Sequence, residues 1–139
     1  MPKQSAARRP VSVYALAGVR LFNGVTGLLT PNVLIRRLEP GRELSPAAVY
    51  AFRLFGIRTI LLGLDLLTSR GEQLREDLRE GVVIHSSDTA TAAMLGIRGQ
   101  LPPRTAALTT LISATNTILA ASGAADVSAN SRPVKGKRK

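Results

Sequence analysis

Several residue types are absent or scarce in this chain of 139 residues, and each absence excludes a kind of chemistry. There is no cysteine, which excludes disulfides, thiol catalysis and thiolate metal sites. The single histidine, His85, cannot form a histidine metal cage within one subunit. We also find no Gly-rich phosphate loop that would hold a nucleotide cofactor. We therefore expect no catalytic residues, no metal and no cofactor, and we favour a non-catalytic protein.

Tryptophan is also absent, and aromatic residues make up only 4% of a chain whose net charge is +10. Such a charge is typical of nucleic-acid binding in a soluble protein. A basic tail without aromatic residues on which bases can stack is poor evidence for that function, however. The basic residues gather at both ends and in the connecting segments, which leaves four apolar blocks in the middle of the chain.

These four blocks predict an all-α protein, a four-helix transmembrane bundle with short loops and disordered basic termini. The predicted spans are residues 11–30, 46–68, 81–98 and 104–121, within one membrane domain over 11–121. Residues 1–10 are predicted to form a basic N-terminal arm and residues 122–139 a disordered basic tail. The block 46–68 would be roughly 34 Å long, enough for a hydrocarbon core of about 30 Å.

Local signals place some of the boundaries of these blocks. Ser45 is a suitable helix cap, and Pro46 follows it in the first turn. Residues 31–44 contain Pro31, Pro40 and Gly41, which predict a loop or a short interfacial turn. Block 81–98 is the most polar of the four, so it either spans while burying its polar face or forms a re-entrant or interfacial helix.

The positions of the basic residues predict an orientation. Four spans place both termini on the same side as the segment 70–80. That side carries Lys3, Arg8, Arg9, Arg70, Arg75, Arg79, Arg132, Lys135, Lys137, Arg138 and Lys139, whereas the other side carries Arg36, Arg37, Arg42, Arg98 and Arg104. Because Lys and Arg accumulate on the cytoplasmic side, we expect a multi-pass protein of the inner (cell) membrane with both termini in the cytoplasm.

Ionisable side chains within the predicted spans form the candidate site: Arg20, Arg53, Arg58, Asp65, His85 and Asp88. A charge at the membrane centre costs about 3 kcal/mol or more, so these groups should face one another or an aqueous cavity. We expect Asp88 to be the counter-ion of Arg58 or Arg53, and His85 to share a helix face with Asp88. The cluster either fixes the packing of the helices or forms a ligand or proton site.

Small and polar residues at helical spacing indicate where helices approach one another. The candidates for helix packing are Gly24, Gly27, Gly56, Gly63 and Asn116. Glycine allows two helix backbones to come close, and an asparagine side chain can form a hydrogen bond across the interface.

The run Arg53-x-x-Gly56-x-Arg58, with Gly63 after it and Asp88 as the acidic residue of the third span, resembles a group of small actinobacterial four-helix membrane proteins of unknown function. Their pattern is R-x-x-G-x-R-D followed by a glycine, and Thr59 replaces the aspartate here. The resemblance covers spans two and three best. It implies a four-helix integral membrane protein and brings no established activity.

Three functions stay open on this reasoning. The first is a small non-catalytic membrane protein that acts as a partner or accessory subunit of a membrane assembly, or that forms a homo-oligomer in the lipid bilayer. The second is a membrane protein that handles a ligand, a lipid or a proton through the intramembrane cluster. The third, which the charge distribution disfavours, is a soluble basic helical nucleic-acid binder.

Overall fold

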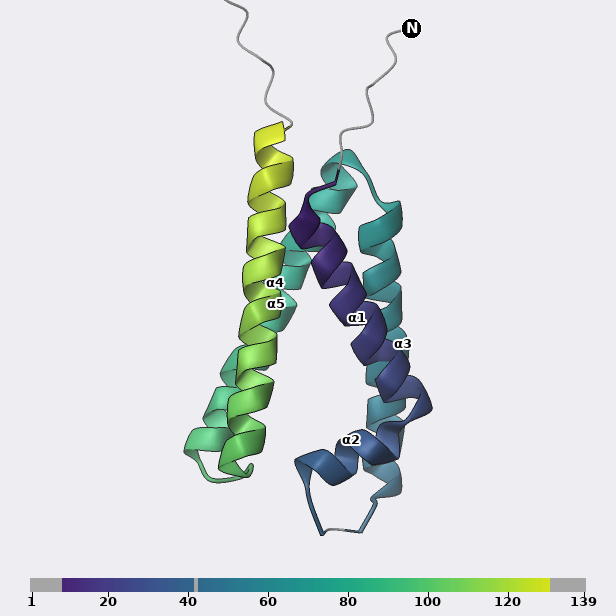
Figure 1. The fold of residues 1–139 in the computed structure, drawn as a ribbon, viewed down its shortest axis with the longest axis vertical. Coiled ribbons are helices and arrows are strands. Elements are labelled where there is room, and N and C mark those ends of the chain that lie inside the picture. The colour runs from purple at the N-terminus through teal and green to yellow at the C-terminus, as the bar shows by residue number, and fades with distance from the viewer. Residues whose placement is uncertain (1–8, 42, 131–139) are drawn as a thin grey trace, which may run out of the picture.

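The chain forms two helical hairpins in a computed structural model that describes residues 9–41 and 43–130. Within these residues the helices are α1 (Val11–Leu29), α2 (Pro31–Leu38), α3 (Pro46–Thr68), α4 (Gly71–Ile97) and α5 (Pro103–Asn130), and there is no strand. Helix α1 packs along α3, and α4 packs along α5. The two hairpins converge at the end near the chain termini and diverge towards the end that carries α2 (Figure 1). The predicted all-α class is confirmed.

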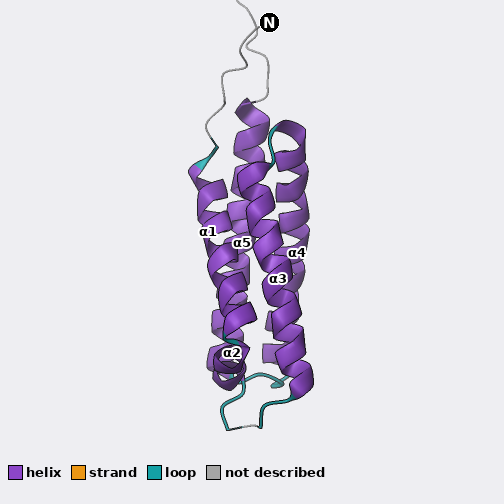
Figure 2. Cartoon of the chain, turned by 90° about the vertical axis from the view of Figure 1, so that its right-hand side faces the viewer, coloured by secondary structure: helices purple, strands orange, loops and turns teal. Residues whose placement is uncertain are grey.

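The two hairpins face each other as two layers (Figure 2). At the convergent end their contact is made by a core of small and aliphatic side chains from α1, α3, α4 and α5. This core consists of Val13, Leu16, Ala17, Leu66, Leu74, Leu78, Ala120 and Val127. Arg9 adds a hydrogen bond at the same end, from Nη2 to the carbonyl oxygen of Ser69 (2.7 Å), next to the α3–α4 connection. The hairpins are therefore joined at one end only.

Helix α1 and helix α3 touch through their backbones. A Cβ atom built on Gly56 would lie 2.5 Å from the backbone nitrogen of Leu28 and 2.7 Å from the carbonyl oxygen of Gly24. A Cβ atom on Gly27 would lie 3.2 Å from the carbonyl oxygen of Phe52. No residue other than glycine can occupy Gly56 without separating the helices.

Two predicted boundaries need correction. Residues 31–38, expected to be a loop or turn, form helix α2, because Pro31 starts the helix and is buried together with Ile35. Helix α5 continues past residue 122, where the tail was predicted to begin, and ends at Asn130. The helix continues because this segment packs against the rest of the protein, which its polar composition does not indicate. Gly123 and Val127 are buried, and Gly123 lies against Leu78. Residues 1–8 and 131–139 of the predicted arm and tail lie outside the described residues.

Helix α3 begins and ends where the sequence predicted, with Pro46 in its first turn. Ser45 stands at the N-cap position, but its side chain forms no capping hydrogen bond. Helices α1 and α3 are each long and apolar enough to cross a membrane. Helices α4 and α5 have 27 and 28 residues but do not meet the same criterion. The charged first turns of α4 and the many hydroxyl side chains of α5 account for this difference. The four-span prediction is therefore not confirmed by length and hydropathy.

Candidate functional site

A buried arginine joins the two hairpins below the core. Arg20 on α1 is only 2% exposed, and His85 on α4 is 8% exposed. Arg20 donates from Nε to His85 Nε2 at 3.2 Å, with Nη2 at 3.1 Å from the same nitrogen, and from Nη1 to the carbonyl oxygen of Leu62 at 3.2 Å. One side chain therefore connects α1, α3 and α4.

These hydrogen bonds determine the protonation of His85. Arginine has donors only, so Nε2 of His85 must accept and cannot carry a proton. The ring is then neutral with its proton on Nδ1. Nδ1 lies 3.8 Å from Oδ2 of Asp88, beyond hydrogen-bond distance but close enough for the N–H dipole to favour the carboxylate. The shared face of His85 and Asp88 thus orients the imidazole between an arginine and an acid.

Glycines make room for the Arg20 side chain. A Cβ atom on Gly81 of α4 would lie 2.6 Å from Arg20 Nη2, and one on Gly63 of α3 would lie 3.3 Å from Arg20 Cβ. The carboxylates of Asp77 and Asp65 also act favourably on the guanidinium charge. A buried arginine needs such donors, acceptors and charges around it, because its desolvation is costly.

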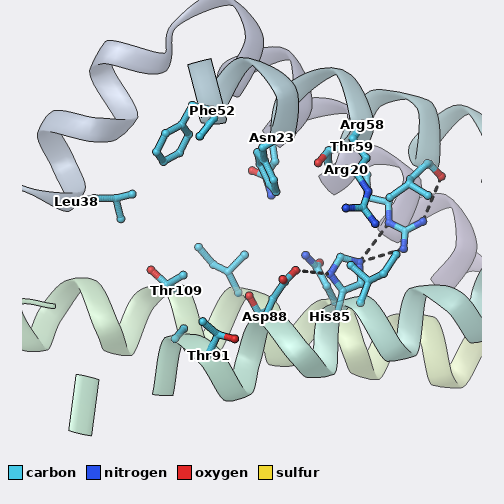
Figure 3. Close-up of a pocket in the computed structure, with 18 of the residues that line it drawn as sticks. Arg20, Asn23, Leu38, Phe52, Arg58, Thr59, His85, Asp88, Thr91 and Thr109 are labelled. Carbon is cyan, nitrogen blue, oxygen red and sulfur yellow. Dashed lines mark hydrogen bonds and ion pairs between the residues drawn. The ribbon is translucent and has the colours of Figure 1, made fainter. Parts of the chain in front are cut away.

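Below Arg20 and His85 an open cavity of about 550 Å³ lies between the diverging hairpins. Its walls come from α1 and α3 on one side and from α4 and α5 on the other (Figure 3). Arg20 and His85 lie at one end, Phe52 and Leu38 lie at the other, and Arg58 and Asp88 extend from opposite walls between them. The cavity therefore changes from charged to apolar along its length.

Three buried polar side chains line this cavity without a hydrogen-bond partner. Asn116 is 6% exposed, and Ser113 and Thr59 are each 9% exposed. No other described residue forms a hydrogen bond with any of these three side chains. Buried polar groups are nearly always paired in native proteins, with protein, water or a ligand. Because these side chains face the cavity, water or a bound molecule there can pair with them.

The structure brings together only part of the predicted cluster. Arg20, Arg58, His85, Asp88 and Asn116 line the cavity, whereas Arg53 and Asp65 do not. Arg53 and Arg58 are five residues apart, so a helix of 3.6 residues per turn places them about 140° apart. Asp65 shares the face of Arg58 but lies nearer the convergent end, where the core fills the space.

The predicted packing glycines all lie at helix contacts: Gly24, Gly27 and Gly56 between α1 and α3, and Gly63 against Leu21 and Arg20. The sequence reasoning missed Asn23, Thr59 and Ser113 as members of the cavity wall. Signals for them existed. Asn23 interrupts the apolar block 11–30, Thr59 follows Arg58 within the apolar block 46–68, and Ser113 lies three residues before Asn116.

Comparison with known proteins gives no indication of function, so the function is argued from the residues of the site. No protein-family model, curated protein sequence or solved structure that was compared matches the chain. The resemblance to actinobacterial four-helix proteins stays a prediction. Within residues 9–41 and 43–130, no three side chains of His, Asp or Glu are placed to hold a metal ion. The site consists of an arginine–histidine pair that joins the hairpins and an open, partly charged cavity below it.

Proposed function

We propose that this chain is a small, non-catalytic, multi-pass protein of the inner membrane that binds an amphipathic molecule between its two hairpins. The membrane part of the proposal is supported first by α1 and α3, which are long and apolar enough to span. Helices α4 and α5 expose large apolar side chains that lipid would cover. These are Val83, Met94, Ile97, Leu108, Leu111 and Ile118.

The hydroxyl groups of α4 and α5 support the same environment. Six of the twelve donate to a carbonyl oxygen three or four residues earlier in their own helix, which satisfies a hydroxyl where there is no water. Examples are Thr89 to His85, Thr109 to Thr105, Thr115 to Leu111, Thr117 to Ser113 and Ser128 to Ala124. Because α1 begins and α5 reaches Asn130 at the convergent end, the positive-inside rule favours the cytoplasm for that end.

The observation that carries the binding function is the cavity with its unpartnered polar groups. A volume of about 550 Å³ falls within the range of small-molecule pockets, roughly 300–1,000 Å³. Its apolar end is lined by Phe52, Leu38 and Leu101, and its polar end offers Arg58, Asp88 and Asn116. Such an arrangement suits a molecule with a polar head and an apolar tail. The role of partner subunit is the alternative, because a protein segment could also occupy the cavity.

One purification tests both parts of this proposal. The full chain is expressed, membranes are washed with carbonate, and the protein is extracted in an uncharged maltoside detergent for native mass spectrometry. We expect recovery with the membranes and a bound mass of lipid size. Ser113→Phe should fill the cavity and remove this adduct, whereas Ile118→Phe, on the outer face of the same helix, should keep it.

Three results would contradict the proposal in different ways. Recovery of the chain in the soluble fraction would contradict the membrane assignment. Identical spectra for the wild type, Ser113→Phe and Ile118→Phe would contradict binding in the cavity. A second polypeptide that is lost only with Ser113→Phe would support the partner role in place of the ligand role.

A further inference from the structure

Two opposite charges face each other across the cavity without forming an ion pair. Arg58 extends from α3, and Asp88 extends from α4 on the opposite wall (Figure 3). Both side chains are exposed to the cavity, and no contact within 4.0 Å joins them. Asp88 feels the charge of Arg58 across the cavity, as the predicted pairing requires, but its nearest ionisable neighbour is the neutral His85, with Nδ1 at 3.8 Å from Oδ2. The α1–α3 hairpin thus presents a positive charge to a bound molecule, and the α4–α5 hairpin presents a negative charge.

We propose that the molecule bound here is a zwitterionic amphiphile, with a primary ammonium and an acidic phosphate or carboxylate in its head and a single apolar tail. The acidic group pairs with the Arg58 guanidinium, which is suited to two parallel hydrogen bonds with an oxyanion. The ammonium pairs with Asp88. The tail extends along Phe52 and Leu38 at the apolar end. This inference rests on the proposed function of the cavity as a ligand site.

The other head chemistries each leave a group of the cavity unsatisfied. A purely anionic head would lie beside the carboxylate of Asp88. A purely cationic head would lie between Arg58 and the buried Arg20. A head without charge would leave Arg58 and Asp88 with only their attraction across the cavity and without a direct ion pair, which is unfavourable in a partly apolar cavity. Only a head of both signs pairs every charged group that the cavity presents.

The unpartnered polar groups match the remaining atoms of such a head. The amide of Asn116 and the hydroxyls of Thr59 and Ser113 can donate to oxygen atoms of a phosphate or carboxylate. Asn116 lies on α5, so the head would contact both hairpins. The hydrogen-bonded side chains of Arg20 and His85 form one end of the cavity. The head group would therefore lie next to this pair and extend no further towards the convergent end of the hairpins.

The test compares three probes on the purified full chain in maltoside detergent, measured by native mass spectrometry. Lysophosphatidylethanolamine carries both charges and one chain, lysophosphatidylglycerol carries only the anion, and free phosphoethanolamine has the head without a tail. We expect the first to bind about tenfold more tightly than the second, and the third to bind weakly. Arg58→Gln should weaken both lipids by about tenfold.

Asp88→Asn provides the sharpest result. It should weaken lysophosphatidylethanolamine about tenfold and strengthen lysophosphatidylglycerol, which reverses the preference and also shows that the variant is folded. Arg53→Gln and Asp126→Asn are the matched controls, because they make the same changes of charge at exposed residues of α3 and α5 outside the cavity. They should leave the binding of both lipids unchanged.

The outcomes separate this inference from the function on which it rests. If neither lipid binds the wild type, the proposed binding function fails. A second outcome is that lysophosphatidylglycerol binds as tightly as lysophosphatidylethanolamine, or more tightly, and that Asp88→Asn changes the affinity of neither lipid. The cavity is then a ligand site, but the proposal of a zwitterionic head is wrong. If free phosphoethanolamine binds as tightly as its lipid, the ligand is a soluble zwitterion and the amphiphilic tail is overturned.

Discussion

The contact within a hairpin and the contact between hairpins are built from different residues. Between α1 and α3 the backbones touch at Gly24 and Gly56, and a Cβ atom on Gly56 would meet only backbone atoms of α1. Between the hairpins a long charged side chain, Arg20, fills the space and bonds to His85. The first contact allows one geometry, because backbone atoms cannot move independently. The second can adjust, because an arginine has several rotatable bonds.

This difference suits a protein that binds between its hairpins. The close backbone contact of α1 with α3 holds one wall of the cavity together, and Arg20 connects this wall to α4 on the other side. The core at the convergent end holds the joint in place, and its buried members Leu66, Leu78 and Ala120 come from three helices. A ligand would then contact two stable surfaces whose separation the joint determines.

The largest expected effect comes from a methyl group placed in the backbone contact. Gly56→Ala should destabilise the protein by about 2 kcal/mol or more, because the new Cβ would lie 2.5 Å from the backbone nitrogen of Leu28. Thermal unfolding in detergent measures the loss. Gly18→Ala on α1 is the control, because a Cβ atom there meets nothing within 4 Å, and it should be neutral or slightly stabilising. Equal melting temperatures for the two variants would refute a backbone contact between α1 and α3.

A smaller effect is expected from the joint between the hairpins. Arg20→Met should cost about 1–3 kcal/mol, because it leaves the buried Nε2 of His85 without a donor. His85→Leu alone should also destabilise the protein. The double variant should be about 1 kcal/mol more stable than the sum of the two single losses predicts. Arg58→Met, an arginine on the cavity wall, is the control and should change stability by less than about 0.5 kcal/mol. Strict additivity of Arg20→Met and His85→Leu would show that the two side chains do not stabilise each other.

Local signals were sufficient for helix α3, whose ends at Pro46 and Thr68 depend on residues next to them. The sequence also placed Arg20 in the predicted intramembrane cluster, because a charge within an apolar block should face other polar groups or a cavity. The partner of Arg20 could not be derived. The prediction paired Asp88 with an arginine and did not pair Arg20 with His85, since the pairing depends on how α1 and α4 are rotated and how far the hairpins diverge. Neither quantity is local to either helix.

The smallest effect compares two glycines of α4 that differ in what they face. A Cβ atom on Gly81 would lie 2.6 Å from the end of the Arg20 side chain, and one on Gly96 would lie 2.6 Å from the Cβ of Ala106. Alanine improves helix propensity by about 1 kcal/mol at either position, so the difference between the variants reports the clash alone. The Arg20 side chain can move, whereas the Cβ of Ala106 is fixed to the backbone of α5. Gly96→Ala should therefore be less stable than Gly81→Ala by about 1 kcal/mol in thermal unfolding. Equal stability would mean that the contact between hairpins is as rigid as the contact within one, and the proposed adjustment at Arg20 would be lost.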